Sequence, residues 1–166
     1  MSGSIFLVGL PGCGKSTLGR AAAEHAGRPF ADVDEEIVRQ HGPIPALFVR
    51  GGEALFRPLE SAALERLCHS VGAVISCGGG IILREQNVAS MKAAGRIVFL
   101  DRPLEAILSD IAYAERPLLS GGEASLRALA TARLPLYHAC ADATIINDGT
   151  FEQARDAILC LLEEKP

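Results

Sequence analysis

A short glycine-rich segment near the start of the chain has the residue types and spacing that bind phosphate. It reads Gly9-Leu10-Pro11-Gly12-Cys13-Gly14-Lys15-Ser16-Thr17, which fits the pattern G-x-x-x-x-G-K-[ST]. The glycines let backbone N–H groups wrap a phosphate, and the helix expected to follow directs its partial positive charge at the same point. The residues expected to contact a nucleotide are Gly12, Cys13, Gly14, Lys15, Ser16 and Thr17. The alternative is a chance match in a glycine-containing turn, which the flanking strand and helix disfavour.

Two side chains of this loop have separate tasks in such a site. Lys15 can bring a mobile positive charge to the β- and γ-phosphates of a nucleoside triphosphate, and the Ser16 hydroxyl can ligate Mg²⁺. The pattern does not separate kinases from GTPases or motor ATPases, so the acceptor side has to be predicted from other residues.

Two carboxylates, Asp32 and Asp34, stand two residues apart where the apolar segment 30–34 ends. On a strand they would project from the same face, and the carboxyl edge of a parallel sheet would bring them beside the phosphates. We expect Asp32 to help hold Mg²⁺ and Asp34 to accept a proton from an acceptor hydroxyl. Helix capping by these carboxylates is the alternative.

Three glycines, Gly78 to Gly80, follow another apolar segment, which ends in Ser76 where most P-loop proteins have a magnesium-positioning Asp. The glycines allow close backbone approach to a ligand, and a plain flexible turn is the alternative. Arg57 and Glu60 are neighbours three residues apart on a predicted helix, where Glu60 can hold the guanidinium. A surface ion pair that adds little stability is the alternative reading of this pair.

The elements that must position these residues alternate between strand and helix. Strand-length apolar runs lie at residues 5–9, 30–34, 73–77, 97–100 and 144–147, and helix-period segments at 15–26, 53–67, 86–94, 104–112, 126–141 and 151–162. This alternation predicts an α/β fold, a three-layer sandwich around a five-stranded parallel sheet. No linker divides residues 1–166, so we expect one domain. Segments 42–45 and 113–123 resist regular assignment, and the second is predicted to be a mobile lid.

Composition excludes several other classes of function. The 166 residues are 49% hydrophobic with a net charge of −4, and the basic residues are scattered, so nucleic-acid and membrane partners are not expected. Five scattered cysteines argue against a disulfide framework and a zinc site. No apolar run is long enough for a signal peptide or a membrane span, so we expect a cytoplasmic protein.

Over nearly its whole length the chain resembles the shikimate kinase family. The features that carry the resemblance are the phosphate-binding loop, Asp32-Val33-Asp34, Arg57-x-x-Glu60, Ser76-Cys77-Gly78-Gly79-Gly80, Arg116-Pro117-Leu118-Leu119 and Arg133-Leu134-Pro135-Leu136-Tyr137. The resemblance implies a P-loop NTPase fold of the nucleoside monophosphate kinase type with sheet order 2-3-1-4-5. It also implies transfer of the γ-phosphate of ATP to shikimate, with Mg²⁺, in aromatic amino acid biosynthesis.

The resemblance also assigns roles to individual residues. Asp34 would orient and deprotonate the 3-hydroxyl, and it would be catalytic together with Lys15 and Arg116. Arg57 and Arg133 would clamp the shikimate carboxylate, and Gly79 would contact the ring hydroxyls through its backbone. Arg116, in the lid, would reach the phosphates of ATP.

The sequence departs from the family pattern at one position. Many members carry an arginine that stacks on adenine seven residues before the lid arginine, and here that position is Ser109. Residues 147–150 resemble the adenine loop of the family, with Thr150 as an expected nucleotide contact. Two alternatives stay open, namely another small-metabolite kinase of the gluconate kinase kind and a non-catalytic relative that binds nucleotide. We expect a monomer.

Overall fold

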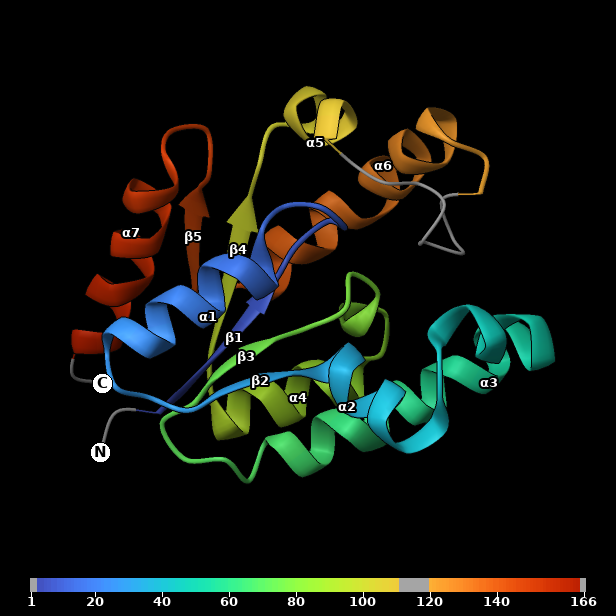
Figure 1. Cartoon of the computed structure of the whole chain (residues 1–166), viewed down its shortest axis with the longest axis horizontal. Helices are drawn as coiled ribbons and strands as arrows, with labels where there is room; N and C mark the ends of the chain where they lie inside the picture. Colours follow the sequence, from blue (N-terminus) through green and yellow to red (C-terminus); the bar gives the residue numbers. More distant parts are fainter. Residues whose placement is uncertain (1–2, 111–119, 165–166) are drawn as a thin grey trace.

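A computed structural model of the chain describes residues 3–110 and 120–164 (Figure 1). Its sheet has five parallel strands: β1 (Ser4–Val8), β2 (Phe30–Asp32), β3 (Val74–Ser76), β4 (Gly95–Asp101) and β5 (Ala143–Ile146). The strand order is β2-β3-β1-β4-β5, which confirms the predicted order 2-3-1-4-5.

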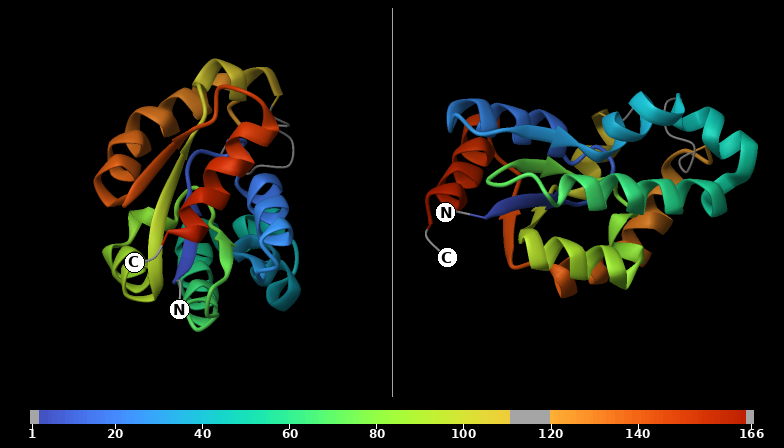
Figure 2. Two further views of the ribbon diagram at one scale, coloured as in Figure 1. Left: turned by 90° about the vertical axis from the view of Figure 1, so that its left-hand side faces the viewer. Right: turned by 90° about the horizontal axis from the view of Figure 1, so that it is seen from below.

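The strands connect through helices, as expected of a parallel sheet. In chain order these are α1 (Lys15–His25), α2 (Val33–His41), α3 (Ile44–Leu67), the 3-10 turn η1 (Ile81–Leu83), α4 (Glu85–Ala94), α5 (Leu104–Asp110), α6 (Glu123–Cys140) and α7 (Phe151–Glu163). Helices α1 and α7 cover one face of the sheet, and α4 and α6 lie on the other (Figure 2). The predicted three-layer sandwich is therefore confirmed. None of the helices in the described ranges is long and apolar enough to cross a bilayer.

The central strand, β1, is largely apolar and buried, which is why helices cover both faces of the sheet. Every residue of β1 is buried, and the strand pairs with β3 on one side and β4 on the other. Phe6 lies opposite Ile75 of β3 and opposite Ile97 of β4, and all three side chains have no exposed surface. Such apolar strands need helices on both faces to keep water away. The phosphate-binding loop is thus built on the most buried part of the fold.

The segment between β2 and β3 differs from the sequence prediction. Helix α2 was missed, and residues 42–45 are irregular only up to Pro43, because α3 begins at Ile44. Pro45, the second residue of α3, is tolerated because the N–H that proline lacks would have had no partner in the first turn of the helix. Gly52, at φ 59° and ψ −154°, interrupts α3 and accounts for the predicted helix start at residue 53. Helices α2 and α3 pack together beyond the end of β2 (Figure 1).

We predict that Ile75→Ala lowers the free energy of unfolding by about 2–5 kcal/mol, because it leaves a cavity in the middle of the sheet. Val49→Ala is the matched control, since Val49 is 89% exposed on α3 and should change stability little. Urea denaturation followed by circular dichroism measures both variants. Equal stability of the two would contradict the described core.

Candidate active site

The phosphate-binding loop lies between the end of β1 and the start of α1. Gly12 and Gly14 have φ angles of 80° and 99°, which lie in the left-handed region that favours glycine. The Lys15 side chain folds back over the loop, and its Nζ donates to the carbonyls of Gly9 and Leu10 at 2.9 Å each. Lys15 is only 8% exposed. Its ammonium is therefore already inside the loop that would surround a phosphate.

Two side chains that directly follow other strands donate hydrogen bonds to carbonyls of this loop. Arg102, just after β4, donates from Nη1 to the Gly12 carbonyl at 3.1 Å. Asn147, just after β5, donates from Nδ2 to the Cys13 carbonyl at 3.0 Å. Two successive carbonyls are thus bonded away from the loop interior. This arrangement favours an interior lined by N–H groups, as an anion-binding loop requires.

Asp32 connects the loop to the neighbouring strands. Its Oδ2 accepts the Ser16 hydroxyl at 2.5 Å, and the Ser16 Oγ lies 2.9 Å from the Oγ of Ser76. The Oδ1 of Asp32 accepts the backbone N–H groups of Asp34 at 2.9 Å and Glu35 at 3.2 Å. Three side-chain oxygens from α1, β2 and β3 therefore meet at one point.

These bonds correct the prediction for the segment 30–34. The strand ends at Asp32, which is the N-cap of α2, and Asp34 lies in the first helical turn. The same-face argument for Asp32 and Asp34 was therefore wrong, and the capping alternative is right for Asp32. The physical reason is that Asp32 accepts two N–H groups that a helix start leaves without partners. Both carboxylates nevertheless line one cavity, because the helix begins directly at the edge of the sheet.

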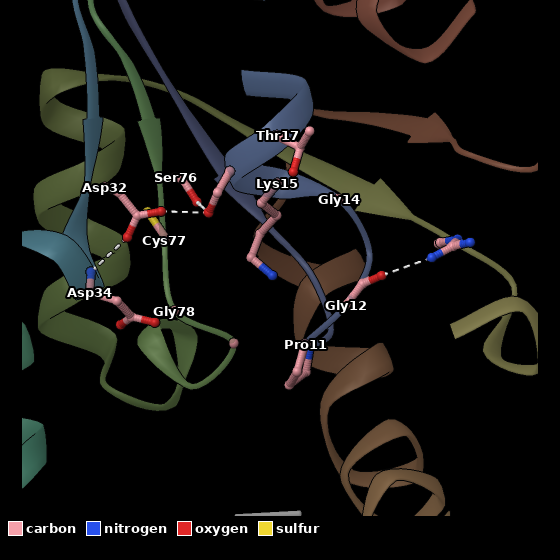
Figure 3. Close-up of a pocket in the computed structure, with 13 residues that line it drawn as sticks. Pro11, Gly12, Gly14, Lys15, Thr17, Asp32, Asp34, Ser76, Cys77 and Gly78 are labelled. Carbon is pink, nitrogen blue, oxygen red and sulfur yellow. Dashed lines mark hydrogen bonds between the residues drawn. The ribbon is translucent and has the colours of Figure 1, made fainter. Parts of the chain in front are cut away.

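That cavity has a volume of about 340 Å³ and lies between the phosphate-binding loop and the glycine segment after β3 (Figure 3). Lys15 and Asp34 both point into this space in Figure 3. The sequence-predicted residues that line it are Gly12, Gly14, Lys15, Ser16, Thr17, Asp32, Asp34 and Gly79. Cys13 is buried and takes part in the loop through its carbonyl.

The three glycines after β3 lie directly against charged side chains. A Cβ atom on Gly80 would be 2.3 Å from Nη1 of Arg57, and one on Gly79 would be 3.3 Å from Nη1 of Arg133. A Cβ atom on Gly78 would be 2.8 Å from Oε1 of Glu60. A side chain at Gly78 or Gly80 would collide with these charged groups and one at Gly79 would be tightly placed, so the glycines permit the close approach, which the flexible-turn alternative does not explain. The segment 78–80 connects the cavity to a cluster of buried charges.

Within this cluster Arg57 and Glu60 form a buried ion pair, with Nη1 to Oε2 at 2.8 Å. Glu60 is 1% exposed and Arg57 8%, so the surface-pair alternative was wrong. Burial raises the pKa of Glu60, and the charge of Arg57 offsets only part of that effect. Removing one partner of such a pair costs about 3–5 kcal/mol. In the described part of the chain, Nη2 of Arg57 and Oε1 of Glu60 are buried without a hydrogen-bond partner.

Helix α6 brings the second guanidinium of the cluster. Arg133 is 4% exposed, and one helical turn later Tyr137 donates its hydroxyl to the Gly79 carbonyl at 2.5 Å. The Tyr137 ring stacks on Phe99 of β4 with centroids 5.2 Å apart. Burial raises the pKa of Tyr137, so the phenol stays protonated and keeps donating. Tyr137 thus fixes the peptide of Gly79 next to Arg133.

The remaining predicted residues lie elsewhere. The Thr150 side chain caps α7, because its hydroxyl oxygen accepts the Gln153 N–H at 3.2 Å. Ser109 is exposed and donates to the Ala106 carbonyl at 2.9 Å. Arg116 lies outside the described residues. Sequence reasoning missed Arg102, although its place after a strand that ends at the ligand edge of the sheet was a usable signal.

Comparisons with known proteins agree with this geometry. A sequence model described as shikimate kinase matches residues 11–163. A shikimate kinase of Clostridium beijerinckii is 41% identical over 149 residues, covering 89% of this chain and 88% of that protein. The structure of a shikimate kinase from Acinetobacter baumannii in complex with shikimate matches with a TM-score of 0.90 at 38% identity, covering 98% of this chain and 92% of that one. A gluconokinase from Sinorhizobium meliloti, covering 96% of this chain and 91% of its own with a TM-score of 0.62 at 20% identity, shares the fold alone. Because the sequence model matches nearly all of the chain and the Clostridium beijerinckii relative is 41% identical to it, the chain belongs to the shikimate kinase family.

Proposed function

We propose that this chain is a shikimate kinase that transfers the γ-phosphate of ATP to the 3-hydroxyl of shikimate. One observation carries the proposal. The glycines at 78–80 join the cavity of Lys15 and Asp34 to a cluster with two buried guanidinium groups. A hydroxy acid with its carboxylate on the guanidinium groups can therefore extend toward the donor phosphate.

The balance of charge supports recognition of a carboxylate. Arg57 and Arg133 are both buried, while Glu60 is the nearly inaccessible carboxylate between α3 and the glycine segment. Glu53 also accepts from Nε of Arg57 at 3.0 Å, but this carboxylate is half exposed. Nη2 of Arg57 has no partner among the described residues. A ligand carboxylate would supply the missing acceptor and an opposing charge in the forked geometry that guanidinium groups prefer.

Asp34 is the residue proposed to act on the acceptor hydroxyl. It lies across the cavity from Lys15, and a Cβ atom on Gly78 would be 3.1 Å from its Oδ1. A carboxylate in this place can orient the hydroxyl and take its proton as the oxygen attacks phosphorus. Lys15 would leave its carbonyl partners to stabilise negative charge on the transferring group. Arg116 and the lid at 113–123 stay proposals from the sequence.

The oxygens of Ser16 and Asp32 suit Mg²⁺, and we propose that they hold it. Both are hard oxygen donors, and they lie 2.5 Å apart beside the Ser76 hydroxyl. Mg²⁺ at kinase sites takes few protein ligands and completes its shell with water and substrate phosphates. Bound there, it would neutralise part of the phosphate charge. We also propose, from the sequence, a single domain that works as a monomer.

Purified protein with ATP, Mg²⁺ and a panel of hydroxy acids tests the function. We expect ADP to form with shikimate and much less with quinate or gluconate, and a new phosphate monoester to appear by ³¹P NMR. Turnover with gluconate but not with shikimate would contradict the proposal. Nucleotide binding with no turnover on any acid would instead indicate the non-catalytic alternative.

We predict that Asp34→Asn lowers kcat with shikimate by a factor of about 10² or more, because the amide cannot take the proton. ADP binding and the unfolding midpoint should stay close to those of the unmodified chain. A coupled assay of ADP release measures the change. Unchanged turnover would remove Asp34 from the proposed mechanism.

For Lys15→Met we predict loss of activity without unfolding, because the apolar stem is largely kept while the charge next to the phosphates is lost. Single-turnover transfer of labelled γ-phosphate measures the effect on the chemical step. If the rate stayed normal, the phosphate-binding loop would not serve catalysis.

For Arg133→Ala we predict weaker shikimate binding by about 1.5–3 kcal/mol, with ATP affinity nearly unchanged, since a charge-assisted contact is lost. Arg57→Ala should act in the same direction but also destabilise the fold, because it leaves Glu60 buried without its partner. Arg39→Ala is the control, since its side chain is 72% exposed on α2. Equal weakening of ATP and shikimate in Arg133→Ala would contradict the assignment.

A further inference from the structure

Arg102 stands at the boundary between two cavities. The first is the cavity of about 340 Å³ that contains Lys15 and Ser16. The second, of about 310 Å³, is lined by Phe151 and residues 147–149 together with the start of α1. Both cavities share Gly14, Thr17 and Arg102. A ligand with its phosphates in the first cavity and its other end in the second would therefore run along Gly14, Thr17 and Arg102.

Two contacts hold this guanidinium in place. Nη1 donates to the Gly12 carbonyl at 3.1 Å, and Nη2 is paired with the carboxylate of Asp110 at the end of α5. The Arg102 side chain is 25% exposed, while that of Asp110 is 59% exposed. The hydrogen bond from Arg102 lowers the pKa of Asp110, so the pair is ionised at neutral pH. A flat cation is thus fixed at the boundary before any ligand arrives.

The other side chains near this boundary do not offer the same charge. Arg102 is the one cation among the described residues that line the second cavity, where Asp148 is the carboxylate. The Ser109 hydroxyl is hydrogen-bonded within its own helix, to the Ala106 carbonyl and to the Asp110 carboxylate. Ser109 therefore brings no positive charge to this boundary, and Arg102 is the cation that the described residues place there.

We propose that Arg102 is a nucleotide-binding residue that presents its guanidinium plane to the nucleoside part of the donor. The placement of the phosphates in the first cavity rests on the proposed function. A fixed guanidinium can lie against the face of a base and loses little freedom when it does so. Its bond to the Gly12 carbonyl also connects the nucleoside side of the site to the phosphate-binding loop.

Calorimetric titration without shikimate tests this role with two probes, ADP and inorganic tripolyphosphate. We expect Arg102→Ala to weaken ADP about tenfold and to change tripolyphosphate binding much less, since tripolyphosphate has no nucleoside. Arg102→Lys keeps the charge but not the plane, so it should recover part of the loss. In steady-state assays the KM for ATP should rise while the KM for shikimate stays constant.

Arg127→Ala is the matched control. Arg127 also pairs with a carboxylate of α5, at 2.9 Å from Glu105, but it lines neither cavity in the described part of the chain. This variant should bind ADP like the unmodified protein. Unchanged ADP affinity in Arg102→Ala would overturn the proposal, and so would equal weakening of ADP and tripolyphosphate, which would indicate a role through the loop alone. Neither result depends on the identity of the acceptor, which the hydroxy-acid panel tests separately.

Discussion

The buried ion pair of Arg57 and Glu60 is the interaction on which the acceptor side of this protein depends. Glu60 holds Arg57 against Gly80 through an ion pair, and Arg133 approaches Gly79 from another helix, so two buried guanidinium groups lie near one fully buried carboxylate. Burying charge is costly unless each group is paired and hydrogen-bonded. Arg57 already faces Glu60 and the half-exposed Glu53, whereas Arg133 is buried and forms no ion pair among the described residues, so an anionic ligand would give Arg133 an opposing charge. The donor side differs, because Lys15 is held there by the loop carbonyls of Gly9 and Leu10 rather than by a buried carboxylate.

The parallel sheet brings these two sides together. All five strands end at the same edge, so side chains that follow β1, β2, β3, β4 and β5 converge there without long connections. Asp32 is shared between the two functions of that edge, because it accepts from Ser16 of the phosphate-binding helix and caps the helix that carries Asp34. A change that shifts one element therefore alters the distance between donor and acceptor. Helix α2 follows β2 with no residue between them, so Asp32 belongs to both elements.

The sequence predicted the sheet and the phosphate-binding loop well, because both rest on local patterns in apolar segments. It did not predict where β2 ends, since whether Asp32 continues a strand or caps a helix depends on N–H groups that only the fold positions. The close contact of Gly80 with Arg57 could not be predicted either, because a run of glycines in the sequence does not indicate which side chain packs against it. The contact of Arg102 with the Gly12 carbonyl was equally unpredictable, since the two residues are far apart in the chain, although the place of Arg102 after a strand was a usable signal.

Recognition of a carboxylate by the buried guanidinium pair is the central claim, and the ligand rather than the protein offers its most direct test. Calorimetry should compare the binding of shikimate with that of its methyl ester, which keeps the ring and its hydroxyls but has no charge. We expect the ester to bind more weakly by about 10-fold to 150-fold, as loss of a charge-assisted contact implies. Equal affinity for the acid and the ester would contradict the account.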